Sequence, residues 1–271
     1  MASLLGLLPA MAFGFSAPAR IASPVHASRA SMITAALPEL YVYDHCPFCV
    51  RVRMALGVKG IQHKLVFLGN DDVETPTALV GRKIAPIWVD EDGPMMESLD
   101  IIKKMDPEGF FAPSSGRTDL KAWQKSVQTL MRKLQRPRYV KVVLPEFMQK
   151  AGRDAFVANH QMPPYEKADW KGFKGNPDMS LETKYEKYEE AFAESAELVP
   201  QLNEKLKELE GMICCAECCT EGGLSYDDID LWARLRSLTV IKGIEYPSKV
   251  RAYLDHFEAK GDVPLYDVMA I

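Results

Sequence analysis

The run Cys46-Pro47-Phe48-Cys49 constrains the fold of this chain more than any other feature, because it separates a strand pattern from a helix pattern. Residues 40–43 (LYVY) are apolar and aromatic, and Pro47 suits a first helical position, where its missing N–H is no loss. Unpaired N–H groups and the helix dipole would favour a thiolate at Cys46. Cys49 faces the same way one turn later, so it can displace a partner held on Cys46 as a mixed disulfide. The spacing predicts thiol-disulfide exchange, with Cys46 and Cys49 as the catalytic pair.

Half of a zinc site is the alternative interpretation of this spacing, since metal knuckles share it. The nearest cysteines that could supply the other ligands are the four in residues 214–219 (CCAECC). The sequence gap between the two groups is much longer than the gap between the two ligand pairs of a zinc ribbon. We therefore favour the redox interpretation. Arg51 and Arg53 would add positive potential to the helix or simply be solvated, and His45 is given no role, because a turn histidine more often faces solvent.

Short strand and helix patterns alternate as far as residue 105. Strands are expected at 40–43, 63–68, 86–89 and 94–96, and helices at 47–56, 74–80 and 98–105. Gly60 can close the first helix in a left-handed conformation. The order is β-α-β-α-β-β-α, in which a right-handed crossover makes the first two strands parallel neighbours. We therefore predict an α/β thioredoxin-like N-terminal domain over residues 39–106.

Helix patterns alone follow a breaker-rich linker at 107–117. Apolar residues at helical spacing come first, with Thr118 or Asp119 as the expected cap. They are Leu120, Trp123, Val127, Leu130 and Leu134. An all-α C-terminal domain is thus predicted over residues 118–271.

The rest of this domain contains two further helix signals. The pattern of residues 180–209 predicts one or two long surface helices. Pro200 would interrupt them or begin the second. Ser225 and Asp228 can form a capping box, so a helix should start there and run to about Val240.

The first 38 residues contain no acidic side chain and are rich in Ala, Ser and Pro. Organellar transit peptides have this composition, so residues 1–38 are predicted to be a targeting peptide for a plastid or mitochondrion. A secretory leader, with an apolar stretch at 4–8 and a small-x-small motif at 10–12, is one alternative. The other alternative is a disordered extension without a targeting signal, in which case we expect a cytoplasmic protein.

Charge and cysteine placement limit the partners of this chain. The formal net charge of -4 lacks the basic excess of a nucleic-acid-binding protein, and no apolar run is long enough to span a bilayer. All six cysteines lie in two tight clusters, unlike a secreted disulfide framework, which favours a reducing compartment. We therefore expect a monomer without nucleic-acid or membrane partners.

Several separated motifs occur in an order that points to one family. They are YVYDHCPFC at 41–49, LGNDD at 68–72 with ETPT at 74–77, MESLDI at 96–101, LSYDDI at 224–229, YPSKV at 246–250 and MAI at 269–271. Together they closely resemble the glutaredoxin 2 family of two-domain glutaredoxins, from about Glu39 to Ile271. The resemblance implies a glutathione-transferase-like architecture and reduction of protein disulfides and protein-glutathione mixed disulfides, with glutathione as co-substrate and no bound cofactor.

Site residues follow from the resemblance where the motif positions match. Pro86 would be a cis-proline facing the cysteine pair, and the backbone of Ala85 would bond to the cysteinyl part of glutathione. Glu97 and Ser98 would bind the γ-glutamyl end, since a helix N-terminus and a hydroxyl suit its carboxylate and Glu97 can accept from its amino group. Phe48, also in this set, replaces the family's more usual tyrosine and removes a hydroxyl. Ala85 replaces a bulkier valine, which keeps the backbone contact but can loosen it.

Two other functions stay open at this point. A cysteine-type glutathione transferase or dehydroascorbate reductase shares the architecture, although the retention of Cys49 argues against it. A protein that binds a metal or an iron-sulfur cluster could use either group of cysteines. Residues 214–219 have no counterpart in the family and could chelate a soft metal or form accessory disulfides. We expect an ordinary surface loop there, without a metal and dispensable for the main reaction.

Overall fold

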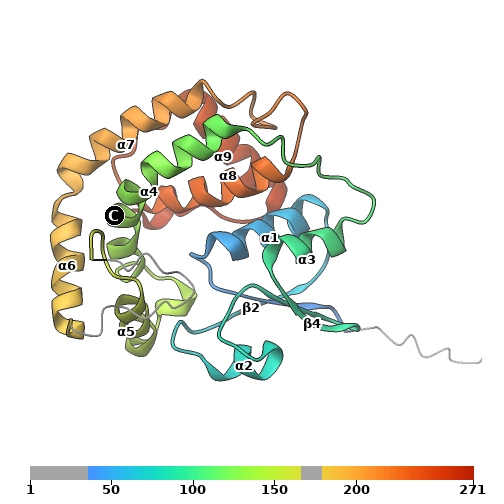
Figure 1. Cartoon of the computed structure of the whole chain (residues 1–271), viewed down its shortest axis with the longest axis horizontal. Helices are drawn as coiled ribbons and strands as arrows, with labels where there is room; N and C mark the ends of the chain where they lie inside the picture. The colour runs from blue at the N-terminus through green and yellow to red at the C-terminus, as the bar shows by residue number, and fades with distance from the viewer. Residues whose placement is uncertain (1–35, 166–178) are drawn as a thin grey trace, which may run out of the picture. The chain divides into compact units, whose positions relative to one another are not determined.

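Residues 36–165 and 179–271 are described by the computed structural model of this chain (Figure 1). The predicted targeting peptide at 1–38 therefore lies outside the described residues, apart from its last three. No helix in the described ranges is both long and apolar enough to cross a membrane.

Four strands form one mixed sheet in the order β2-β1-β3-β4. Their bounds are β1 Glu39–Val42, β2 Lys64–Phe67, β3 Ile87–Asp90 and β4 Gly93–Met96. β1 pairs parallel with β2 and antiparallel with β3, and β3 pairs antiparallel with β4. Leu40 and Val42 point into the core from the central strand and are fully buried. The predicted parallel pair and the final hairpin are both confirmed.

Three helices accompany the sheet, α1 Pro47–Val58, α2 Glu74–Val80 and α3 Ser98–Met105. α1 and α3 pack against each other on one side of the sheet, and α2 lies on the other (Figure 1). Gly60 closes α1 with a φ of 65°, in the left-handed conformation that favours glycine. This is the expected thioredoxin-like arrangement.

The secondary-structure elements of residues 118–165 and 179–271 are all helices. The α-helices are α4 Thr118–Tyr139, α5 Lys150–Asn159, α6 Leu181–Ala193, α7 Ser195–Glu210, α8 Tyr226–Arg236 and α9 Ser248–Gly261. Short 3-10 helices occur at η1 Pro145–Phe147, η2 Ser237–Val240 and η3 Asp267–Met269. α8 and α9 cover α1, and buried residues from the strands to α9 form one continuous core. The domain limits at 39–106, 107–117 and 118–271 stay predictions.

Two details of the predicted helices are wrong. Arg117, not Thr118 or Asp119, is the N-cap of α4, because the Asp119 carboxylate pairs with the Arg117 guanidinium instead of capping. Pro200 lies inside α7, whereas the chain bends at Glu194. The Ser195 hydroxyl donates to the Phe192 carbonyl at 2.5 Å. A side chain thus occupies a carbonyl that would otherwise accept a backbone hydrogen bond of the helix, and α6 ends there.

The capping box that begins α8 is confirmed. The Asp228 carboxylate accepts from the Ser225 N–H at 2.8 Å, and the Ser225 side chain accepts from the backbone of Asp228. The helix expected to run to Val240 remains α-helical only to Arg236 and continues as η2.

Candidate active site

Cys46 is the N-cap of α1, with an extended backbone that turns into the helix at Pro47. Its side chain is half-buried, whereas Cys49 has no exposed surface. The Cys49 sulfur accepts from the Tyr43 N–H at 3.4 Å, which holds it beneath the loop. A partner molecule can therefore reach Cys46 before Cys49.

The pKa values of the two thiols are shifted in opposite directions. A hydrogen bond from Cys49 lowers the pKa of Cys46 to about 6, with help from the charge of His45 and from N–H groups of α1, while burial opposes the shift. Burial, and then the hydrogen bond to Cys46, raises the pKa of Cys49 well above its ordinary value. At neutral pH Cys46 is therefore the thiolate, and Cys49 keeps its proton.

His45 has a buried partner that the sequence did not reveal. Its Nδ1 lies 2.6 Å from Oε1 of Glu146, and its backbone N–H donates to the same oxygen at 2.8 Å. Glu146, in η1, is 1% exposed. Burial alone would raise its pKa, but the contacts with His45 hold that pKa below its usual value. The imidazole is thus hydrogen-bonded to a buried carboxylate and does not lie in solvent as expected.

Asp44 ties the loop before Cys46 to the helical part. The Arg236 guanidinium of α8 donates to the Asp44 carbonyl at 2.8 Å and to both carboxylate oxygens at 3.1 and 3.2 Å. The Tyr266 hydroxyl donates to the same carbonyl at 2.9 Å. These contacts fix the backbone two residues before the reactive cysteine.

Neither arginine of α1 is simply solvated. Arg53 forms an ion pair with Asp44, and Arg51 forms one with Asp230 of α8. The Arg51 guanidinium also lies over the Phe48 ring, 4.8 Å from its centroid. Both positive charges are therefore matched by carboxylates, and the Phe48 ring lies against the Arg51 guanidinium.

Strand register brings the other predicted residues to the edge of the sheet where Cys46 lies. Ile87 pairs with Tyr41 of β1 and with Met96 of β4. The residues immediately before β3 and immediately after β4 therefore emerge at the end of β1 that leads to Cys46. The first pair is Ala85-Pro86, joined by a cis peptide bond as the resemblance implies, and the second is Glu97-Ser98.

Glu97 has an unusual backbone conformation for a residue other than glycine. Its φ is 74°, and it precedes Ser98, the buried first residue of α3. Such a conformation costs on the order of 1–3 kcal/mol and is found mostly where function requires it. The Glu97 carboxylate is exposed and lies 3.1 Å from Arg82. A negative and a positive group thus lie together beside the start of α3, and the part of Glu97 and Ser98 in binding glutathione stays a prediction.

Comparisons with known proteins point to one family. A model of the glutaredoxin 2 C-terminal domain matches residues 180–270, and a model of the glutathione S-transferase N-terminal domain matches residues 40–108. Glutaredoxin 2 of Escherichia coli strain K12 is 34% identical over 236 residues, covering 86% of this chain and 100% of that protein. The crystal structure of glutaredoxin 2 from Salmonella typhimurium in complex with glutathione has a TM-score of 0.74 and 32% identity. That match covers 88% of this chain and 100% of the other.

Proposed function

Because this chain belongs to the glutaredoxin 2 family of glutathione-dependent oxidoreductases, we propose that its C-P-F-C dithiol reduces protein-glutathione mixed disulfides and protein disulfides. The single observation that carries the proposal is the pairing of a half-buried Cys46, with a pKa of about 6, and a fully buried Cys49 beneath it. One sulfur is ready to attack, and the other is in reach to resolve.

With a mixed disulfide, the Cys46 thiolate attacks the glutathione sulfur. A bond forms between Cys46 and glutathione, and the protein sulfur leaves and takes a proton from water. A second, reduced glutathione then attacks the glutathione sulfur on Cys46. Oxidised glutathione leaves and the Cys46 thiolate returns. The two halves of the oxidised glutathione are the glutathione that was bound to the substrate and one free glutathione, and the protein sulfur has been released as a thiol.

With an internal protein disulfide, Cys46 forms a bond to one protein sulfur, and the other sulfur leaves as a thiol. Cys49 then loses its proton and attacks Cys46. This step releases the second protein thiol and leaves a Cys46–Cys49 disulfide, which two glutathione molecules reduce.

Glutathione would bind along the sheet edge described above. The backbone of Ala85 would pair with its cysteinyl part beside Pro86, and Phe48 would lie against it. Glu97 would accept from the amino group of its γ-glutamyl end, and Ser98 would donate to the carboxylate there. The crystal structure of the Salmonella typhimurium relative in complex with glutathione supports glutathione as the ligand.

Turnover of a glutathione mixed disulfide, coupled to glutathione reductase, tests the proposal. We expect turnover that requires glutathione and disappears in the Cys46→Ser variant. Comparable rates with a conjugation substrate or with dehydroascorbate would instead favour the transferase or dehydroascorbate reductase alternative.

A further inference from the structure

A second group of thiols lies in the turn that joins α7 to α8. The Cys215 N–H donates to the Cys218 carbonyl at 3.0 Å and closes the turn. The sulfurs of these two residues are 3.3 Å apart. Together with Cys214, they form a group of three sulfurs that all lie within 4.8 Å of one another. Backbone pairing thus gathers three potential ligands at one point.

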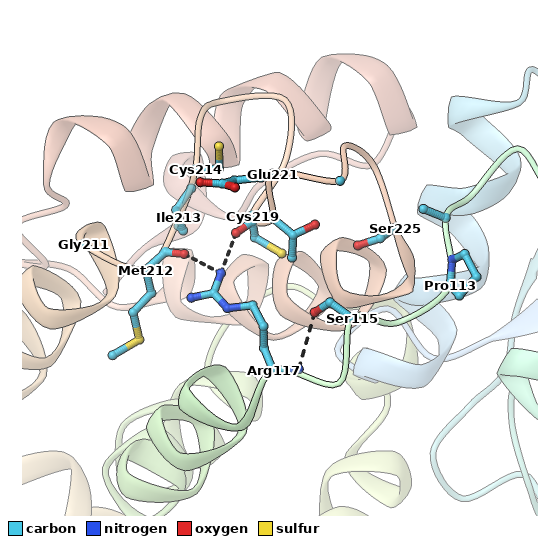
Figure 2. A pocket seen from close by; sticks show the side chains of 13 residues that line it. Pro113, Ser115, Arg117, Gly211, Met212, Ile213, Cys214, Cys219, Glu221 and Ser225 are labelled. Atoms are coloured by element: carbon cyan, nitrogen blue, oxygen red, sulfur yellow. Dashed lines mark hydrogen bonds between the residues drawn. The ribbon is translucent and has the colours of Figure 1, made fainter.

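Cys219, the fourth cysteine of the turn, has a different surrounding. It is fully buried, its N–H donates to the Asp228 carboxylate at 2.6 Å, and its carbonyl accepts from Arg117 at 2.7 Å. Figure 2 shows this carbonyl and that of Met212 bound to the Arg117 guanidinium at the side of a cavity of about 530 Å³. Cys219 therefore anchors the turn, while Cys214 is exposed and Cys215 is partly so.

We propose that Cys214, Cys215 and Cys218 bind one soft metal ion through three thiolates, with monovalent copper as the best match. Three sulfurs at about 2.3 Å from an ion in their plane lie about 4 Å from one another. The sulfurs here are between 3.3 and 4.8 Å apart, so shifts of well under 1 Å complete the site. The exposed Cys214 gives the ion a path from solvent.

The chemistry of the three sulfur ligands determines which metal ion the site prefers. Thiolates favour copper(I) and zinc, and among the described residues the group within 4.8 Å consists of these three sulfurs, which suits a three-coordinate ion. The carboxylate beside them, Glu217, is held by the Cys215 thiol and is a hard ligand. Binding releases the thiol protons to water, and no electron is transferred.

A disulfide between Cys215 and Cys218 is the competing interpretation of their short separation. It would use two of the three sulfurs and leave the position of Cys214 unexplained. The metal site uses all three, and it does not rest on the function proposed for Cys46.

Titration of the reduced full chain with copper(I), against a chromophoric copper(I) chelator and without oxygen, tests the proposal. The Cys46→Ser/Cys49→Ser background removes the other dithiol. We expect one ion per chain, and a loss of affinity of about 10-fold or more when Cys214, Cys215 and Cys218 are changed to serine. Equal affinity in that variant would overturn the proposal.

Alkylation mapping keeps the test decisive even if the serine variant unfolds. Copper(I) should protect Cys214, Cys215 and Cys218 together and leave the reactivity of Cys219 unchanged. The matched variant Glu217→Gln should keep its copper(I) affinity. Zinc binding that requires Glu217, or a Cys215–Cys218 disulfide that reduced glutathione does not open, would contradict the copper site.

Discussion

Cys46 and Cys49 have such different surroundings that their substitution should give different defects. Cys46→Ser should abolish turnover of mixed disulfides and of protein disulfides, because it removes the accessible thiolate. Cys49→Ser should keep much of the mixed-disulfide turnover, since a second glutathione can release the first, and lose most reduction of protein disulfides. Parallel assays with both substrates check this. Equal inactivation of the mixed-disulfide reaction by both substitutions would contradict it.

The acidity of Cys46 predicts a pH profile. Its rate of alkylation by iodoacetamide should fall as the pH drops through about 6, because the thiolate is lost there. Cys49→Ala removes the hydrogen bond that lowers the pKa most, so the midpoint should rise toward the ordinary cysteine pKa of about 8.5. A midpoint that does not move in this variant would assign the low pKa to His45 and the helix instead.

At the scale of single residues, the local sequence singled out both cysteines, and the family resemblance added the residues around the sheet edge, whose roles stay predictions. The local sequence was not enough for His45, because the carboxylate that binds its ring is 101 residues away. Glu146 lies in a short 3-10 helix with no motif of its own. Such a pair forms only when elements that are far apart in the sequence pack together. A local sequence pattern gives no information about that packing.

Helices α1 and α9 come into contact at two glycines, and this makes one element-scale prediction. A Cβ atom on Gly57 would overlap the carbonyl of Gly261, which is backbone and cannot turn aside. Gly57→Ala should therefore lower the free energy of unfolding by about 1–3 kcal/mol, the cost of overpacking. Gly211→Ala is the matched control, because the added atom would have only ordinary contact with Glu208. Urea unfolding of both variants measures the difference, and equal stability would contradict this account of the packing.

The helix boundaries predicted from the sequence were most accurate where a single local signal determined the boundary. The bounds of α2 and α3, and the start of α8 at its capping box, were predicted correctly. The bend between α6 and α7 was not, since the sequence offers Pro200 as a breaker and the structure uses Ser195. Arg138 of α4 also donates to that serine hydroxyl, so a tertiary contact helps to hold the bend.

A buried ion pair between Asp44 and Arg236 joins the loop before Cys46 to helix α8. Asp44 is 7% exposed and Arg236 is 2% exposed. Asp44→Asn leaves two buried guanidinium groups, those of Arg236 and Arg53, without a carboxylate and should cost about 3–5 kcal/mol of unfolding free energy. Asp100→Asn, which breaks an exposed pair with Lys103, should cost less than about 1 kcal/mol. Similar losses in the two variants would contradict the importance of the buried pair.

The same pair predicts how stability depends on pH. Burial would raise the pKa of Asp44, but Arg236 and Arg53 outweigh it and hold that pKa below its usual value. The stabilisation is therefore present above the unfolded-state value of about 3.9 and is lost as the pH falls through the lower folded-state value. The stability gap between the wild-type chain and Asp44→Asn should narrow below about pH 4.

A chain beginning at Leu37 should fold and keep its turnover, because Leu37–Ile271 form one compact unit. A chain beginning at Asp44 is the control and should fail, since it lacks the central strand β1. Circular dichroism and the coupled assay test both. Loss of folding in the longer chain would mean that residues before 37 belong to the domain.

The bond between Asp44 and Arg236 has a consequence for the protein as it is made. Asp44 leaves the ribosome 192 residues ahead of its partner. At about 5–20 residues per second, the loop before Cys46 waits about 10–40 seconds for the guanidinium that fixes it. The helices that cover α1 arrive equally late. The loop before Cys46 is therefore held by its buried partner only as synthesis ends.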